Sequence, residues 1–115
     1  MRVIVCGGRD YADRDRAWRL LDVFHSSEGK ITALAHGGAR GADEIAGQWG
    51  EAEHIPVRVF PANWKKDGKA AGPIRNQRML AEFKPDAVIA FAGGRGTADM
   101  VRRAEAEGVR VVRMP

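Results

Sequence analysis

Short apolar runs alternate with stretches of helical periodicity along the chain. The runs predict five strands, at residues 3–6, 32–35, 57–60, 87–91 and 109–112. Between them, apolar residues recur at i, i+3, i+4 and i+7, which is typical of helices that pack one face on a sheet. The stripes of the four predicted helices are Ala17, Leu20, Leu21 and Phe24; Ala42, Ile45, Ala46 and Trp49; Asn76, Met79, Leu80 and Phe83, after a first-turn Pro73; and Ala98, Val101 and Ala104 within residues 97–107.

The apolar content of the strands also predicts their order. Residues 3–6 and 87–91 are continuously apolar, as in central parallel strands, whereas Arg58 and Arg110 interrupt two other runs and indicate sheet edges. With right-handed crossovers, this predicts an open five-stranded parallel sheet of order 3-2-1-4-5 with helices on both faces. In such α/β sheets, ligands bind beyond the carboxyl ends of the strands, here in the crevice between the first and fourth strands.

Length and composition limit the number of domains, the location and the class of partner. The 115 residues, 44% hydrophobic and 30% charged, predict one folded domain over residues 1–115. Cys6 is the only cysteine, and residues 1–6 lead directly into a strand and not into a signal peptide. With no apolar run of membrane-spanning length, we expect a cytoplasmic protein with no membrane partner. The net charge of +4 is compatible with nucleic acid or acidic small ligands, and does not decide between them.

Turns rich in glycine and arginine follow three of the predicted strands. Glycine allows close backbone approach, the amides of a following helix attract anions, and arginine pairs with phosphate through two hydrogen bonds. The need for a tight turn is enough to explain the glycines of any one of these loops. Three such loops at the same end of the sheet, each with an arginine, favour a site for a phosphate-bearing ligand. The residues expected to bind it are Gly7, Gly8, Arg9, Asp10, Gly37, Gly38, Arg40, Gly41, Asp43, Gly93, Gly94, Arg95, Gly96 and Thr97, with Arg75 and Asn76 from the third helix.

Other familiar site types do not match. The turns fit neither the G-x-G-x-x-G dinucleotide fingerprint nor the G-x-x-x-x-G-K-[ST] triphosphatase loop, and no residues have metal-ligand spacing. We therefore expect no metal and no cofactor. For the long connection at residues 61–72 two interpretations remain open: a mobile lid whose Trp64 stacks on a base, or a surface loop whose Trp64 packs on the core. His36 lies near the expected pocket, whereas Cys6 is expected to be an inert core thiol.

Four segments taken together resemble a known family. Residues 3–11, 36–43, 71–79 and 93–97 are similar, in this order, to the YspA-like, YpsA-related branch of the SLOG superfamily, and the resemblance spans nearly the whole chain. It implies a Rossmann-like fold and a nucleotide-derived ligand. The superfamily includes the Lonely Guy phosphoribohydrolases and the DNA-processing protein A.

The resemblance to Lonely Guy enzymes is incomplete at the catalytic positions. Gly93, Gly94, Gly96 and Thr97 match their P-G-G-x-G-T-x-x-E motif, and Arg75 and Met79 match R-K-x-x-M. Ala92 replaces the proline, Met100 the glutamate and Asn76 the lysine. The resemblance therefore implies phosphate binding more directly than catalysis. If the chain cleaves an N-glycosidic bond, the candidates are Arg75 with Asp99 or Asp43, and then Asp10, although each aspartate also suits a structural role as a helix cap, a first-turn acid or a partner of arginine.

Three functions follow from these observations. The first is a sensor or processing domain that binds a nucleotide-like small molecule. The second is a nucleoside-monophosphate phosphoribohydrolase, and the third is a single-stranded nucleic-acid-binding module that uses the basic mouth and Trp64. The paired bases Arg102 and Arg103 are most simply a solvated surface. The apolar helix faces are compatible with a homodimer, which the sequence alone does not show.

Overall fold

The computed structural model describes all 115 residues and contains one parallel sheet of five strands. Its order is β3-β2-β1-β4-β5, which confirms the predicted order. Each strand begins and ends within one residue of its predicted bounds. The strands are β1 (Arg2–Cys6), β2 (Ala33–His36), β3 (Val57–Val59), β4 (Ala87–Ala90) and β5 (Arg110–Arg113).

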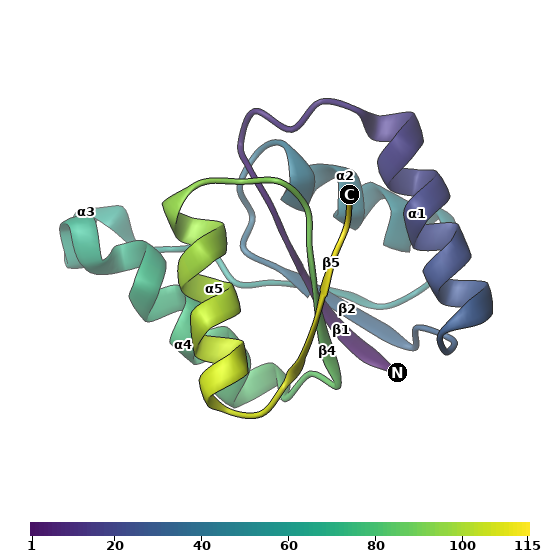
Figure 1. Cartoon of the computed structure of the whole chain (residues 1–115). Coiled ribbons are helices and arrows are strands. Elements are labelled where there is room, and N and C mark those ends of the chain that lie inside the picture. Colours follow the sequence, from purple (N-terminus) through teal and green to yellow (C-terminus); the bar gives the residue numbers. More distant parts are fainter.

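Helices cover both faces of the sheet, as the Rossmann-like prediction requires (Figure 1). On one face lie α1 (Arg14–Ser27) and α2 (Ala42–Ala52), and on the other lie α4 (Ala71–Phe83) and α5 (Arg95–Ala106). No helix is both long and apolar enough to cross a membrane.

Alternating side chains of the central strand build two separate cores. Val3 and Val5 of β1 pack under α1 and α2, whereas Ile4 and Cys6 pack under α4 and α5. Because successive side chains of a strand point to opposite faces, a strand covered on both sides is apolar at every position. Coverage on both faces explains the unbroken apolar run at the start of the chain. Because β1 is the central strand of the sheet, its carboxyl end lies in the middle of the molecule.

The connection at residues 61–72 differs from the predicted loop. It contains a short helix, α3 (Trp64–Asp67), and a 3₁₀ turn, η1 (Gly68–Ala70), that lead directly into α4. The Asn63 side chain caps α3 by accepting a 3.1 Å hydrogen bond from the Lys66 amide. Figure 1 shows α3 projecting away from the sheet on the side of α4. Four residues are too few for helical periodicity to be visible in the sequence.

Candidate ligand-binding site

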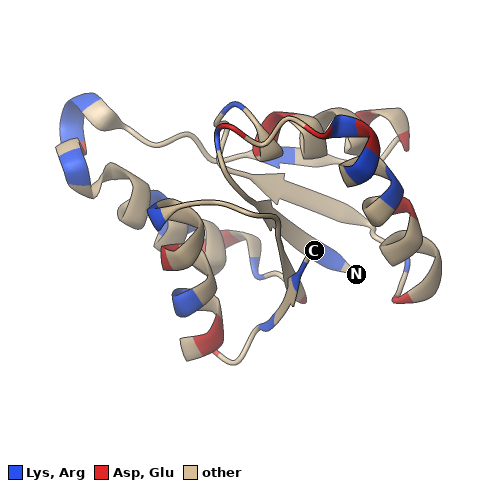
Figure 2. Cartoon of the chain, turned by 45° about the horizontal axis from the view of Figure 1, so that its top comes forward, with Lys and Arg blue, Asp and Glu red and all other residues tan.

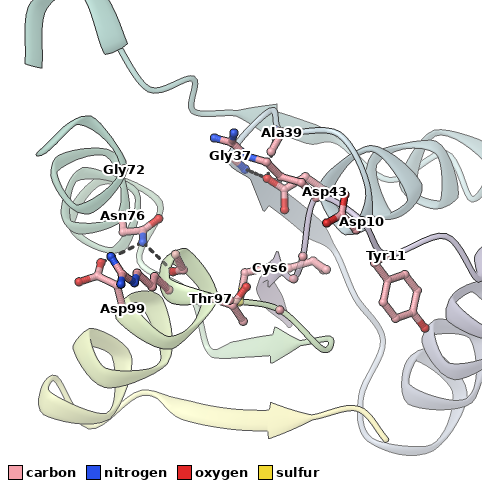
Figure 3. Close-up of a pocket in the computed structure, with 18 of the residues that line it drawn as sticks. Cys6, Asp10, Tyr11, Gly37, Ala39, Asp43, Gly72, Asn76, Thr97 and Asp99 are labelled. Carbon is pink, nitrogen blue, oxygen red and sulfur yellow. Dashed lines mark hydrogen bonds between the residues drawn. The ribbon is translucent and has the colours of Figure 1, made fainter. Parts of the chain in front are cut away.

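A cavity of about 1020 Å³ opens at the carboxyl ends of β1 and β4, in the crevice where the strand order predicted a site. Its volume is typical of small-ligand sites, which reach about 1000 Å³. Figure 3 shows Asn76 and Asp99 on one side of the pocket and Gly37 and Asp43 on the opposite side. The predicted residues that line it are Gly7, Gly8, Arg9, Asp10, Gly37, Asp43, Trp64, Arg75, Asn76, Gly93, Gly94, Arg95, Gly96, Thr97 and Asp99.

The first turn of α5 offers unused hydrogen-bond donors to this cavity. The backbone amides of Arg95, Gly96 and Thr97 donate no hydrogen bond within the protein; the first amide that does so is that of Ala98, to the Gly94 carbonyl at 3.0 Å. No side chain caps the helix at Gly94. A helix N-terminus carries partial positive charge, so an uncapped one that lines a cavity attracts an anion.

In the turn before α2, a carboxylate of the protein itself accepts hydrogen bonds from the backbone amides. Asp43 Oδ2 accepts hydrogen bonds from the amides of Gly37 at 3.1 Å and Ala39 at 3.2 Å. The Gly38 amide donates to His36 Nδ1 at 3.0 Å. Burial raises the pKa of Asp43, although these amides and the charge of Arg75 act against the shift. The two turns thus differ: the amides of Gly37, Gly38 and Ala39 are satisfied, whereas those of the α5 turn are free.

The Arg75 guanidinium projects from α4 and is fixed on two of its three nitrogens. Nε donates to Asn76 Oδ1 at 3.0 Å, and Nη1 donates to the carbonyls of Gly37 at 2.6 Å and Phe60 at 3.4 Å. Nη2 donates to no protein group. Burial lowers the pKa of Arg75 and the Asp43 charge raises it, but an arginine remains protonated at neutral pH. A rigidly held cation with two unused N–H groups therefore lines the cavity.

Asn76 joins Arg75 to Asp99 and to the α5 turn. Its Nδ2 donates to Asp99 Oδ2 at 3.0 Å and to the Gly96 carbonyl at 3.2 Å. Because an ionised carboxylate only accepts hydrogen bonds, Asp99 fixes the orientation of this amide and leaves Oδ1 for Arg75. Asn76 is 4% exposed, so this link between α4 and α5 is internal.

Asp99 is held as an anion at the edge of the cavity. Arg102 Nη2 donates to its Oδ1 at 2.7 Å and Arg103 Nε to its Oδ2 at 2.9 Å. Burial alone would raise the pKa of Asp99, but the hydrogen bonds from Asn76 and Arg103 and the two arginine charges lower it below its usual range. Such a carboxylate is a poor proton donor. Arg102 is exposed, as predicted for a solvated surface, whereas the Arg103 side chain is only 32% exposed. Both also pair with Asp99, which the sequence analysis did not predict; the i,i+4 spacing of Asp99 and Arg103 was the signal for the second pair.

Trp64 lies at the rim of the cavity and not in the core. It is the first residue of α3, its side chain is half exposed, and the Arg9 guanidinium carbon lies 5.6 Å from its ring centroid. Lys69 of the following turn also lines the cavity. The indole is therefore placed to contact a ligand, and base stacking by Trp64 stays a prediction.

Some predicted residues lie outside the main cavity. Gly38 and Arg40 line a neighbouring cavity, and Gly41 lines neither. The structure explains why residue 41 is glycine: its φ is 79°, and a Cβ at this position would collide with the Gly8 carbonyl. His36 is 7% exposed and lines neither cavity; burial lowers its pKa, so a neutral imidazole accepts from Gly38.

Asp10 is not a helix cap. The α1 helix is capped by Asp13, whose side chain accepts a 3.1 Å hydrogen bond from the Arg16 amide. The Asp10 carboxylate is exposed and lies 4.0 Å from Arg40 Nη2. Tyr11 was missed as a lining residue, although it follows Asp10 directly in the first glycine-arginine segment.

Cys6 lines the cavity wall but is expected to be unreactive. The thiol is buried, which raises its pKa to about 12. Against the ordinary pKa of 9.0, this lowers the thiolate fraction at pH 8 roughly a thousandfold. We expect iodoacetamide to alkylate the native protein that much more slowly than the guanidinium-unfolded chain, as followed by mass spectrometry. Similar rates in both states would contradict a protected thiol.

Comparisons with known proteins agree with this architecture. The family model described as "YspA, cpYpsA-related SLOG family" matches residues 1–66. The chain is 36% identical to the Gene 61 protein of Mycobacterium phage D29 over 119 aligned positions, covering 96% of this chain and 94% of that protein. Its fold is similar to that of UDP-GlcNAc 2-epimerase from Neisseria meningitidis, crystallised with UDP-GlcNAc, with a TM-score of 0.62 and 17% identity. The match covers 99% of this chain and 32% of the epimerase, so the chain spans about a third of that enzyme.

Proposed function

The chain belongs to the YspA, cpYpsA-related SLOG family, and on this basis we propose that it binds a nucleotide or a nucleotide-derived ligand that carries phosphate. The observation that carries the proposal is the set of free amides of Arg95, Gly96 and Thr97 in the main cavity. The nucleotide sugar bound by the epimerase of similar fold agrees with this ligand class. We propose that residues 1–115 act as one binding unit, as a sensor or processing domain.

Different residues around the cavity bind the phosphate and the base of the ligand. A phosphate on the α5 turn receives backbone hydrogen bonds and lies among Arg9, Arg75 and Arg95, for which the structure records no ion pair with an acid. The base lies toward Trp64, whose exposed ring offers a stacking surface. Charge-assisted bonds to phosphate and aromatic contact with the base together account for recognition of a nucleotide.

A second candidate activity is phosphoribohydrolysis, and one observation favours it. Asp43 is 5% exposed, lines the cavity, and has a pKa that burial raises, which are the properties of a proton donor. In this reaction the bond between C1′ and the base nitrogen breaks, the base takes a proton from Asp43, and water adds to C1′ while its proton returns to Asp43. The anionic Asp99 is the weaker candidate for this role, because Arg102, Arg103 and Asn76 occupy its oxygens.

The proposed phosphate position is tested by NMR of the ¹⁵N-labelled protein. Titration with AMP is expected to shift the amide resonances of Arg95, Gly96 and Thr97, whereas adenosine, which lacks the phosphate, leaves them in place. Shifts elsewhere with none at this turn would overturn the position, and absence of any shift with AMP, ADP-ribose and NAD would overturn nucleotide binding. Free base appearing in the proton spectrum would establish the second activity.

Gly96→Ala separates ligand binding from folding. A Cβ at Gly96 meets no protein atom within 4 Å, so the methyl group occupies open space beside the free amides. Alanine in a helix is about 0.5–1 kcal/mol more favourable than glycine, so we expect an equal or higher melting temperature. We expect AMP affinity to fall about tenfold or more, equivalent to about 1.4 kcal/mol. Calorimetry of the variant and of Glu105→Gln, an exposed control on the same helix, checks this; unchanged affinity for Gly96→Ala would contradict it.

A further inference from the structure

A second cavity of about 610 Å³ adjoins the main one, and the Arg9 and Trp64 pair lines both. Nine residues line it, and five of these also line the main cavity, so the two spaces have a common wall. The shared residues are Arg9, Gly37, Ala39, Trp64 and Arg75; Gly38, Arg40, Pro61 and Ala62 line the second cavity alone.

The charged lining of the second cavity is entirely basic. Its three ionic side chains are Arg9, Arg40 and Arg75. Only Arg40 forms an ion pair within 4.0 Å, with Asp10, and with side-chain exposures of 75% and 100% this pair is weak. The Asp43 charge acts on Arg75, but the two side chains form no ion pair. Figure 2 shows further basic residues on the projecting α3 helix at the left of the view.

The arginines elsewhere in the chain divide into paired and unpaired ones. Six of them form closer ion pairs with Asp or Glu, at 3.7 Å or less. They are Arg58, Arg78, Arg102, Arg103, Arg110 and Arg113. Five arginines outside the second cavity also have no ion pair: Arg2, Arg14, Arg16, Arg19 and Arg95. What distinguishes Arg9, Arg40 and Arg75 is that all three line one cavity and none of them has an ion pair closer than 4.0 Å.

The backbone around this cavity also presents a free donor. The Arg40 amide donates no hydrogen bond within the protein. The Gly37 carbonyl already accepts a hydrogen bond from Arg75 Nη1. A group that satisfies such a lining accepts several hydrogen bonds and carries negative charge, and phosphate does both.

We propose that the second cavity binds a second phosphate of the same ligand, so that the substrate class is a nucleotide with two separated phosphate groups. The inference rests on the proposed function, since it assigns the first phosphate to the α5 turn. Arg9 and Arg75 line both cavities and bridge the two phosphates, while Arg95 contacts only the first and Arg40 only the second.

The division of arginines between the cavities gives a direct test. Affinities of AMP and adenosine 3′,5′-bisphosphate are measured by calorimetry at equal ionic strength, for the wild type, Arg40→Gln and Arg95→Gln. We expect the bisphosphate to bind wild type about tenfold more tightly than AMP. Arg40→Gln is expected to remove this gain and to change AMP affinity less than about twofold, whereas Arg95→Gln weakens both ligands. Arg19→Gln, the same loss of charge at an exposed site on α1, is the control for long-range electrostatics.

The outcomes separate the two proposals. If AMP binds and the bisphosphate binds no more tightly, or if Arg40→Gln leaves the gain intact or reduces it no more than Arg19→Gln does, the second subsite is overturned and the proposed function stands. If neither nucleotide binds the wild-type protein, the second subsite is overturned, and the proposed function fails with it when ADP-ribose and NAD do not bind either.

Discussion

Replacement of Arg75 by alanine is expected to weaken AMP binding by roughly 30- to 150-fold, equivalent to about 2–3 kcal/mol for lost hydrogen bonds to a charged group. The reason is geometric. Bonds from Nε and Nη1 to Asn76, Gly37 and Phe60 hold the guanidinium in place, so Nη2 reaches the cavity with little entropy left to lose on binding. Isothermal titration calorimetry with AMP measures the effect.

Arg78→Ala is the matched control for this prediction. Arg78 lies one turn further along α4, where it is half exposed and pairs with Glu82 at 2.9 Å. Its removal deletes the same charge from the same helix without touching the cavity, so AMP affinity is expected to change less than about twofold. A folded Arg75→Ala protein that binds AMP within threefold of the wild type would remove Arg75 from the site. Thermal melts accompany both measurements, because the Gly37 and Phe60 carbonyls lose a donor in Arg75→Ala.

The sheet could be predicted from the sequence because its order is encoded in local composition. β1 and β4 lie inside the sheet and are apolar at consecutive positions, while the charged positions of β3 and β5 reflect an exposed edge. The place of the cavity followed from the same order, since parallel strands bring their carboxyl ends to one side. The turns rich in glycine and arginine therefore lie together at the carboxyl ends of the strands, as the strand order predicted.

The hydrogen bonds between side chains of the site could not be predicted in the same way. Asn76 and Asp99 are 23 residues apart and meet only because α4 packs on α5. The sequence placed Asp43 at a helix start, but its hydrogen bonds to Gly37 and Ala39 depend on the path of the turn, which Gly41 sets with its positive φ. Side-chain partners chosen by tertiary packing leave no periodic signal in the chain.

Asp99→Asn is expected to destabilise the protein by about 2–3 kcal/mol at pH 7, because it removes a buried charge-assisted network. The wild-type carboxylate is 7% exposed and accepts from Asn76, Arg102 and Arg103. Asparagine has one acceptor oxygen and adds an NH₂ group that faces other donors. With Asn76 no longer fixed, Arg75 also loses the partner that orients it, so AMP affinity is expected to fall together with stability.

The pH dependence of this loss identifies its electrostatic origin. The pKa of Asp99 lies below its ordinary 3.8, so its charge stabilises the fold above about pH 4, and this contribution is lost as the pH falls through the folded-state pKa. Urea unfolding at pH 7, 5 and 3 is therefore expected to show equal gaps between wild type and variant at the first two values and a smaller gap at pH 3. Glu105→Gln, which removes an exposed carboxylate 3.7 Å from Arg113, is expected to cost less than about 0.5 kcal/mol throughout. A gap for Asp99→Asn that is the same at all three pH values would show that shape, and not the ionised carboxylate, holds α4 and α5 together at the cavity.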